Sequence, residues 1–183
     1  MASARDLITI FVALEMLSLP AYMLAGWRKR DTKSNEAALK YLIYGGVASG
    51  AMIYGMSWVF GLTGSMDYAA IAKQAAQIDA ASQGAFFLAL LLVFAGFGYK
   101  IAAVPFHMWA PDVYVGAPIP VTAFLAVGSK AAGFAILLRF FHFGVGHGAP
   151  TAIPGGLPLL VLLMMICFLT MTLGNLAAIS QEN

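Results

Sequence analysis

Charged side chains are scarce in this chain of 183 residues. Asp, Glu, Lys and Arg together make up 10% of it, whereas hydrophobic residues make up 61%. A soluble globular domain carries about 25% charged residues, because its surface faces water. A chain with fewer than half that share must turn most of its surface toward something apolar. The composition therefore argues against a soluble domain and indicates a membrane protein.

Cysteine and the common cofactor motifs are also nearly absent. Cys167 is the single cysteine, so the chain has no Cys-x-x-Cys pair and no metal-spaced set of Cys and His. The G-F-G at residues 96–98 lacks the third glycine of a dinucleotide-binding loop, because Ile101 stands in its place, and no strand precedes it. We therefore expect no metal site and no bound cofactor in this chain.

Five hydrophobic runs are long enough to cross a lipid bilayer. They cover about residues 7–27, 37–62, 85–104, 120–143 and 157–179. A helix needs roughly 20 residues to cross about 30 Å of hydrocarbon. The runs are apolar all round, whereas long helices of a soluble protein would show a polar face at helical period. We therefore predict an all-α polytopic membrane protein with a single transmembrane domain over residues 1–183.

A basic cluster after the first run indicates the topology. It consists of R-K-R at residues 28–30 together with Lys33. Basic residues beside a membrane segment mark the cytoplasmic side. The cluster lies within a few residues of the bilayer, so topology explains it better than a nucleic-acid-binding surface does. We expect the loop 28–36 to be cytoplasmic, with lipid and no nucleic acid as a partner.

Two local features of the second run make further predictions. The stretch S-N-E-A-A-L-K, residues 34–40, predicts a helix start with Ser34 or Asn35 as the N-cap. Gly46 and Gly50 form a G-x-x-x-G pair, which lets another helix approach closely. Both features predict a helix that packs within a bundle.

Three ionisable residues lie inside hydrophobic runs: Glu15 in the first, Lys100 in the third and Lys130 in the fourth. A charge at mid-membrane costs at least about 2.5–3.5 kcal/mol on insertion scales, so such residues are rare and usually functional. One interpretation is a structural ion pair that holds helices together. The other is proton handling, because a buried lysine is charged when a carboxylate is close and neutral when the carboxylate moves away.

Prolines interrupt the third run directly after its lysine. Pro105 cannot donate a backbone hydrogen bond and disfavours helix at Val104, so we predict a break around Pro105, with Pro111 as a further breaker. The span then continues to about residue 116. A helix broken at membrane depth is tolerated only where protein or a wet cavity surrounds it, and such breaks mark ion sites in transporters. His107 follows within the break and is a candidate for the same path.

Residues 99–134 carry a long motif that resembles the antiporter-like, proton-pumping membrane subunits of respiratory complex I, closest to subunit N of bacterial NADH–quinone oxidoreductase. The motif reads Y-K-I-A-A-V-P-F-H-M-W-A-P-D-V-Y-V-G-A-P-I-P-V-T-A-F-L-A-V-G-S-K-A-A-G-F. Flanking pieces agree: L-E-M-L-S-L-P-A-Y at 14–22, E-A-A-L-K-Y at 36–41, S-G-A-M-I-Y-G-M-S at 49–57 and G-N-L-A-A-I-S-Q-E-N at 174–183. The resemblance implies the first half of an inverted-repeat fold.

Roles for four residues follow from the resemblance. Glu15 matches the family's membrane glutamate, which pairs with the lysine of the broken helix, here Lys100. Lys130 matches the central lysine of the next helix. Lys40 matches a further lysine of the same hydrophilic axis, although its position at the entrance of the second run also suits an interface anchor.

The resemblance also implies a function and its setting. The chain is expected to be a fragment of a non-redox subunit that couples quinone reduction elsewhere in complex I to proton transfer. Its partners would be other membrane subunits, its location the bacterial inner membrane, and NADH and quinone would be handled by other subunits. Two alternatives stay open: a subunit of a cation/proton antiporter or hydrogenase-linked complex, and a scaffold with purely structural ion pairs.

Overall fold

The computed structural model describes residues 1–145 and 159–179, and this part of the chain is built of helices. They are α1 (Leu7–Ala25), α2 (Thr32–Thr63), α3 (Tyr68–Ala75), α4 (Gln83–Ile101), α5 (Trp109–Gly116), α6 (Ile119–Phe124), the π-helix η1 (Leu125–Ser129), α7 (Lys130–Arg139), the π-helix η2 (Phe140–Val145) and α8 (Leu159–Ile179). Five spans are long and apolar enough to cross a membrane, as predicted: α1, α2, α4, the continuous helix from α6 to η2, and α8.

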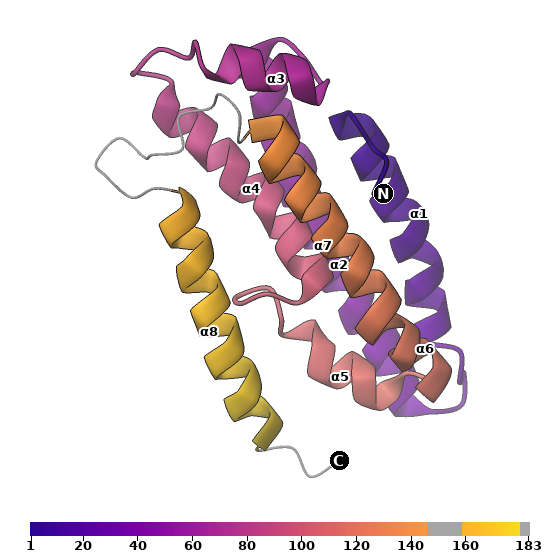
Figure 1. The fold of residues 1–183 in the computed structure, drawn as a ribbon. Helices are drawn as coiled ribbons and strands as arrows, with labels where there is room; N and C mark the ends of the chain where they lie inside the picture. The colour runs from indigo at the N-terminus through magenta and orange to yellow at the C-terminus, as the bar shows by residue number, and fades with distance from the viewer. Residues whose placement is uncertain (146–158, 180–183) are drawn as a thin grey trace.

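Figure 1 shows how the spans are arranged. α2 packs against α1, α4 and α5, and α7 packs against α4. The short helix α3 lies across one end of the bundle, while α5 lies near the opposite end, close to the turn between α1 and α2 (Figure 1). α8 stands at the outer side of α4 and α5. The helix break is therefore on the same side of the bundle as the basic loop.

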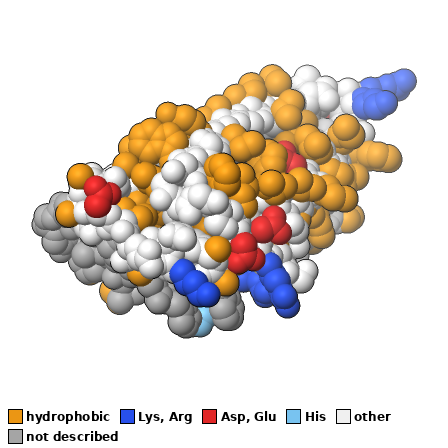
Figure 2. All heavy atoms as spheres, turned by 90° about the horizontal axis from the view of Figure 1, so that it is seen from above, with side chains coloured by type: hydrophobic (Ala, Val, Ile, Leu, Met, Phe, Trp, Pro, Cys, Tyr) orange, Lys and Arg blue, Asp and Glu red, His pale blue; other side chains and the backbone are white. Residues whose placement is uncertain are grey.

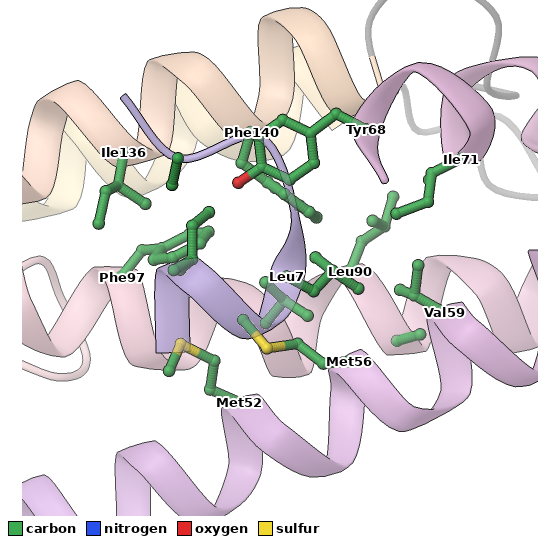
Figure 3. Close-up of a cluster of buried hydrophobic side chains, with 14 of the residues drawn as sticks. Leu7, Met52, Met56, Val59, Tyr68, Ile71, Leu90, Phe97, Ile136 and Phe140 are labelled. Carbon is green, nitrogen blue, oxygen red and sulfur yellow. The ribbon is translucent and has the colours of Figure 1, made fainter. Parts of the chain in front are cut away.

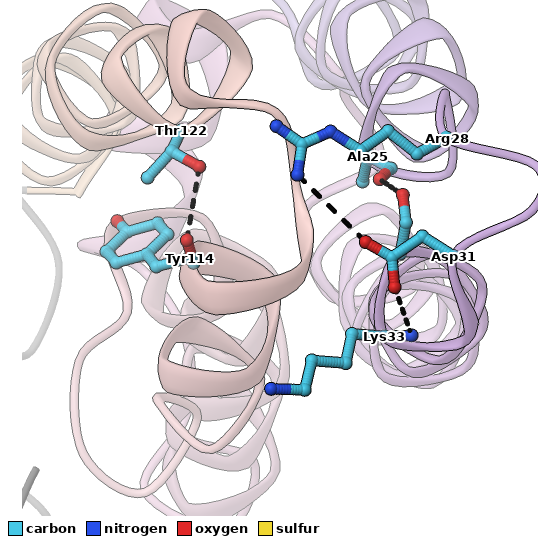
Figure 4. A network of polar contacts seen from close by, with 7 residues as sticks. Ala25, Arg28, Asp31, Lys33, Tyr114 and Thr122 are labelled. Carbon is cyan, nitrogen blue, oxygen red and sulfur yellow. Dashed lines mark hydrogen bonds and ion pairs between the residues drawn. The ribbon is translucent and has the colours of Figure 1, made fainter. Parts of the chain in front are cut away.

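The second helix begins earlier than the sequence indicates. Asp31 is its N-cap, because its carboxylate accepts a hydrogen bond from the Lys33 amide at 3.0 Å (Figure 4). Ser34 is buried instead, and its hydroxyl donates to the carbonyl of Ala25 at 2.8 Å. The prediction of an N-cap at Ser34 or Asn35 is wrong, because Asp31 is an equally good capping residue that lies outside the hydrophobic pattern.

A large apolar cluster holds the spans together at the α3 end. Its members include Leu7 of α1, Met52, Met56 and Val59 of α2, Ile71 of α3, Leu90 and Phe97 of α4, and Ile136 and Phe140 of the fourth span (Figure 3). In a membrane, lipid is as apolar as these side chains, so close packing rather than water exclusion stabilises such a cluster. The cluster fixes α4 against α2 and α7, and α4 carries Lys100.

Glycines decide how closely α2 approaches its neighbours, though not the pair expected. A Cβ atom at Gly55 would lie 2.7 Å from the Ala89 carbonyl oxygen and 2.8 Å from the Val93 amide nitrogen of α4. At Gly46 and Gly50 a Cβ would meet no described atom within 4 Å. The predicted close approach at the G-x-x-x-G pair is therefore wrong within the described chain, because that pair faces outward.

The outside of the bundle is largely apolar. Exposed hydrophobic side chains occur on every span, for example Met16 on α1, Val47 on α2, Val127 on η1 and Met171 on α8. On the face drawn in Figure 2, acidic and basic groups form only small clusters among hydrophobic side chains. This surface suits lipid or other apolar neighbours, as the composition predicts.

Asp6 caps α1 just outside the membrane-spanning segment. Its carboxylate accepts hydrogen bonds from the Thr9 hydroxyl at 2.6 Å and the Thr9 amide at 2.7 Å. These bonds, the hydroxyl one first, lower the pKa of Asp6 from its ordinary value of 3.8. Because the pKa in the folded state is depressed, this stabilisation is present above the ordinary pKa and is lost as the pH falls through the folded value.

We therefore expect Asp6→Ala to lower the thermal stability of the purified full-length subunit at neutral pH, with a cost of about 1 kcal/mol typical for a lost N-cap. The difference from wild type should shrink once the pH falls below the ordinary carboxyl pKa. Asp6→Asn keeps a capping oxygen and serves as the control. A deficit in Asp6→Ala that stays constant down to acidic pH would contradict this explanation.

Candidate functional site

The break in the third span has a defined geometry. α4 ends at Ile101, and Ala102 follows in the left-handed region with φ 57°. The chain turns through Pro105, which follows a cis peptide bond, and α5 begins at Trp109. The predicted break around Pro105 is confirmed. Pro111 lies within the first turn of α5, where a missing N–H is tolerated, so the break precedes it.

Side chains from other segments satisfy backbone groups that the break frees. The Val104 amide donates to the Thr170 hydroxyl of α8 at 3.0 Å. The indole Nε1 of Trp109 donates to the Tyr99 carbonyl oxygen at 3.0 Å. Trp109 also stacks on Tyr41 of α2, with ring centroids 4.6 Å apart. Because unsatisfied backbone groups are costly at membrane depth, these contacts stabilise the broken conformation.

Lys100 occupies the last turn of α4, directly before the break. Its side chain is 1% exposed, and its ammonium donates to the Ser18 hydroxyl of α1 at 3.0 Å. The stem lies beside Gly133 of α7, where a Cβ atom would be 3.4 Å from the Lys100 Cγ. The fold therefore buries this lysine between α1 and α7, and a neutral hydroxyl is its hydrogen-bond partner.

Glu15 lies one turn before Ser18 on α1 and is half-buried. Its carboxylate accepts a hydrogen bond from the hydroxyl of Ser49 on α2. Among the ion pairs of the described residues, none joins Glu15 to Lys100 with an N···O distance of 4.0 Å or less. Glu15 and Ser18 share one face of α1, so the structure brings the predicted partners close together while each is bonded to a serine.

Lys130 begins α7, immediately after the π-helix η1, and is half-buried. Its ammonium lies 5.5 Å from the centroid of the Tyr114 ring, within the range of a cation–π interaction. Lys130 precedes Gly133, the residue beside the Lys100 stem, by one turn of α7. The two lysines are thus placed on neighbouring parts of the α4–α7 contact.

A cavity of about 450 Å³ opens beside Lys130. His107, Tyr114 and Thr170 contribute its other polar lining, and the rest is mainly apolar. The Nδ1 of His107 and the hydroxyl of Tyr114 are buried and have no hydrogen-bond partner among the residues that the structure describes. Buried polar atoms of this kind are commonly satisfied by water. The cavity is large enough to hold several waters and extends from the break to α8.

Lys40 lies in a different environment. Its ammonium is 2.6 Å from a carboxylate oxygen of Glu36 and 2.7 Å from one of Asp112, and its side chain is 37% exposed. The pair with Glu36 lies within α2, whereas the pair with Asp112 joins α2 to α5 near the end of the bundle that carries the basic loop. At the same end, the Thr122 hydroxyl donates to the Tyr114 carbonyl oxygen at 3.3 Å, which fixes the turn between α5 and α6 (Figure 4).

The hydroxyl partners were not among the residues that the sequence suggested. Ser18, Ser49 and Thr170 are ordinary residues of membrane helices, and only the spacing of three residues between Glu15 and Ser18 gives a signal.

No group of three or more His, Cys, Asp or Glu that could hold a metal ion occurs among the described residues.

A family model for the transmembrane part of NADH:quinone oxidoreductase and Mrp antiporter proteins matches residues 4–183. The chain belongs to this family. Among its curated relatives, NADH-quinone oxidoreductase subunit N 2 of Sorangium cellulosum is 53% identical over 188 residues, which cover 100% of this chain and 37% of the relative. Subunit N of an Anaeromyxobacter species is 47% identical, with 100% and 38% covered.

Solved structures of this family share the fold. Respiratory complex I from Thermus thermophilus contains a chain that is 40% identical, with a TM-score of 0.78, and the match covers 98% of this chain and 36% of that chain. A chain of the Mrp complex from a Dietzia species is 26% identical, with a TM-score of 0.66, covering 76% and 26%. The chain thus spans just over a third of the length of its curated relatives.

Proposed function

We propose that this chain is part of a proton-translocating membrane subunit of an NADH–quinone oxidoreductase, and that Lys100 is a working proton site. One observation carries the proposal most directly: a lysine that is 1% exposed lies at a broken membrane helix and is bonded to a neutral serine. A lysine kept only for structure would gain most from a direct carboxylate partner, since an unpaired buried charge is costly.

The geometry supports a path from Lys100 toward Lys130. Lys100 receives a proton with Glu15 near and releases it when the electrostatic influence of the carboxylate decreases, because an opposite charge favours the ammonium form. Lys130 lies one turn before Gly133 on α7, and Gly133 contacts the Lys100 stem. The neighbouring cavity offers His107 and Tyr114 as polar anchors for water, and water would carry the proton between the lysines.

The proposal also implies what the other subunits do and how the chain lies in the membrane. Electron transfer from NADH to quinone would occur in other subunits, and residues 1–183 would hold neither group. Other membrane subunits of the complex would cover part of the apolar outside. Residues 28–36, which form the turn after α1 and the first residues of α2, would face the cytoplasm of a bacterial cell, because their basic side chains follow the positive-inside pattern.

A cation/proton antiporter subunit is the second candidate, and the structural likeness to the Mrp complex favours it. Both candidates use the same fold. The higher identity to proteins named subunit N supports the first. An antiporter would show proton movement that depends on sodium or potassium and not on NADH.

The deciding experiment uses the full-length subunit within its complex, in inverted membrane vesicles. We expect Lys100→Ala to abolish most of the NADH-driven proton uptake that this subunit contributes, measured per electron and per assembled complex, because alanine cannot bind a proton. Lys73→Ala, which changes an exposed lysine of α3, is the matched control and should behave as wild type. Unchanged uptake per electron in Lys100→Ala would make the lysine structural and refute the proposal.

A further inference from the structure

We propose that Ser18 is a positioning residue that holds the Lys100 ammonium away from Glu15, and that it thereby controls how readily the two ions pair. The inference rests on the proposed function, since it concerns the same proton site. It is carried by a juxtaposition in the fold: Ser18 and Glu15 occupy one face of α1, and Lys100 of α4 is bonded to the serine and not to the glutamate.

The hydrogen-bond pattern makes Ser18 an acceptor toward the lysine. Its hydroxyl donates its single hydrogen to the Leu14 carbonyl oxygen at 2.7 Å, one turn back along α1. The oxygen then presents its lone pairs to the Lys100 ammonium at 3.0 Å. Ser18 is fully buried, so water does not compete for this bond. A hydrogen bond to a charged donor in such surroundings is among the stronger ones in proteins.

Glu15 has a serine partner of its own. Ser49 on α2 donates its hydroxyl hydrogen to the Glu15 carboxylate. The two ions are therefore satisfied separately, each by a neutral hydroxyl from another helix. Ser18 lies three residues beyond Glu15, which is about 4.5 Å of helical rise along α1. To pair directly, the ammonium would have to leave Ser18 for the carboxylate. It would give up the bond to Ser18, so Ser18 and Glu15 compete for the same ammonium.

Ser18 also suits both protonation states of the lysine. A neutral amine has a lone pair that the ammonium lacks, and it needs a donor for that lone pair. Rotation about the Cβ–Oγ bond of Ser18 turns its hydrogen from the Leu14 carbonyl to the amine nitrogen, while that carbonyl keeps its helical bond from the backbone. The proton that Lys100 releases passes to water on the path toward Lys130, and Ser18 itself gains and loses none.

Other groups around Lys100 are consistent with this assignment. Tyr22, one turn beyond Ser18 on α1, packs its ring against that of Tyr41 on α2, with centroids 4.7 Å apart. On the α7 side the stem meets Gly133, which has no side chain to bind the ammonium. Among the described residues, Ser18 is therefore the one whose hydrogen bond keeps the Lys100 ammonium apart from Glu15.

The test compares Ser18→Ala, Ser18→Thr and wild type in the complete complex. Without the serine, the balance between the separated and the paired state should shift by roughly tenfold or more toward the pair, as expected for a lost hydrogen bond to a charge. We expect the structure of the Ser18→Ala complex to show Lys100 in direct contact with Glu15. We also expect fewer protons taken up per electron in inverted vesicles, because the paired lysine releases its proton less readily. Ser18→Thr restores the hydroxyl and should restore both.

Ser34→Ala is the matched control, because Ser34 is also a buried serine bonded to a backbone carbonyl but does not contact Lys100. Wild-type uptake per electron in Ser18→Ala, or a Lys100 that stays apart from Glu15 in that variant, would overturn the inference. If Lys100→Ala loses uptake in the same series, the proposed function still stands. If Ser18→Ala does not assemble, Ser18→Cys decides: a thiol of similar size is only a weak acceptor, and wild-type uptake per electron in that variant would overturn the inference.

Discussion

Replacing Gly55 by leucine is expected to prevent the full-length subunit from entering its complex. Gly55 is the position where α2 meets the backbone of α4, and even a Cβ atom there would lie 2.7 Å from the Ala89 carbonyl oxygen. Backbone atoms of a helix cannot move aside as a flexible side chain can. The two spans would have to separate, and overpacking of this kind costs about 1–3 kcal/mol or more.

The measurement is the amount of subunit in complexes purified from membranes. Gly50→Leu is the matched control, because it places the same side chain on the same helix at a position with no described atom within 4 Å of a Cβ. It should assemble as wild type. Equal assembly of the Gly55→Leu variant would show that α2 and α4 do not pack as closely as described.

Thr170→Val should loosen the helix break. Valine has nearly the shape of threonine but no hydroxyl, so the Val104 amide would lose its acceptor. An unsatisfied N–H at membrane depth costs several kcal/mol unless water reaches it. Amide exchange in the segment 102–108, measured by hydrogen–deuterium exchange of the purified complex, is therefore expected to rise about tenfold or more.

Proton uptake per electron should fall in the same variant, because Lys100 lies in the turn before the break. Thr170→Ser keeps the hydroxyl and should protect the segment as threonine does. Exchange in Thr170→Val that matches wild type would mean that the bond from Val104 contributes little to the broken conformation, and that other contacts, such as that of Trp109, hold it.

Hydropathy and proline chemistry were enough to predict the five spans and the position of the break. Both act locally: an apolar run of sufficient length becomes a span wherever it occurs, and Pro105 removes a donor in any context. The start of α2 was misplaced because Asp31 and Ser34 are both suitable caps. Only the contact between Ser34 and Ala25, which comes from the packing of α1 against α2, decides between them.

The site could be predicted only as a set of ionisable residues. Glu15 and Lys100 stand out because each is a charged residue in a hydrophobic run. Their partners are common hydroxyl residues whose roles depend on which helices face each other. Ser49 lies on a different helix from Glu15, and Thr170 lies 66 residues beyond Val104 along the chain. The glycine error has the same origin: Gly50 and Gly55 differ by which neighbour each one faces, and no local pattern records that.

The π-helix η1 directly precedes Lys130, so it sets the direction in which the lysine side chain leaves the helix. A π-turn holds more residues than an α-turn, so the helix that continues beyond it is rotated about its axis relative to the helix before it. Removing one residue from Leu125–Ser129 would turn α7 against α6 by about 100°, the angle per residue of an α-helix. The lysine would then point away from the Tyr114 ring and the cavity, although every side chain around them was unchanged. The number of residues in η1, and not only the side chains around the cavity, therefore determines where Lys130 points.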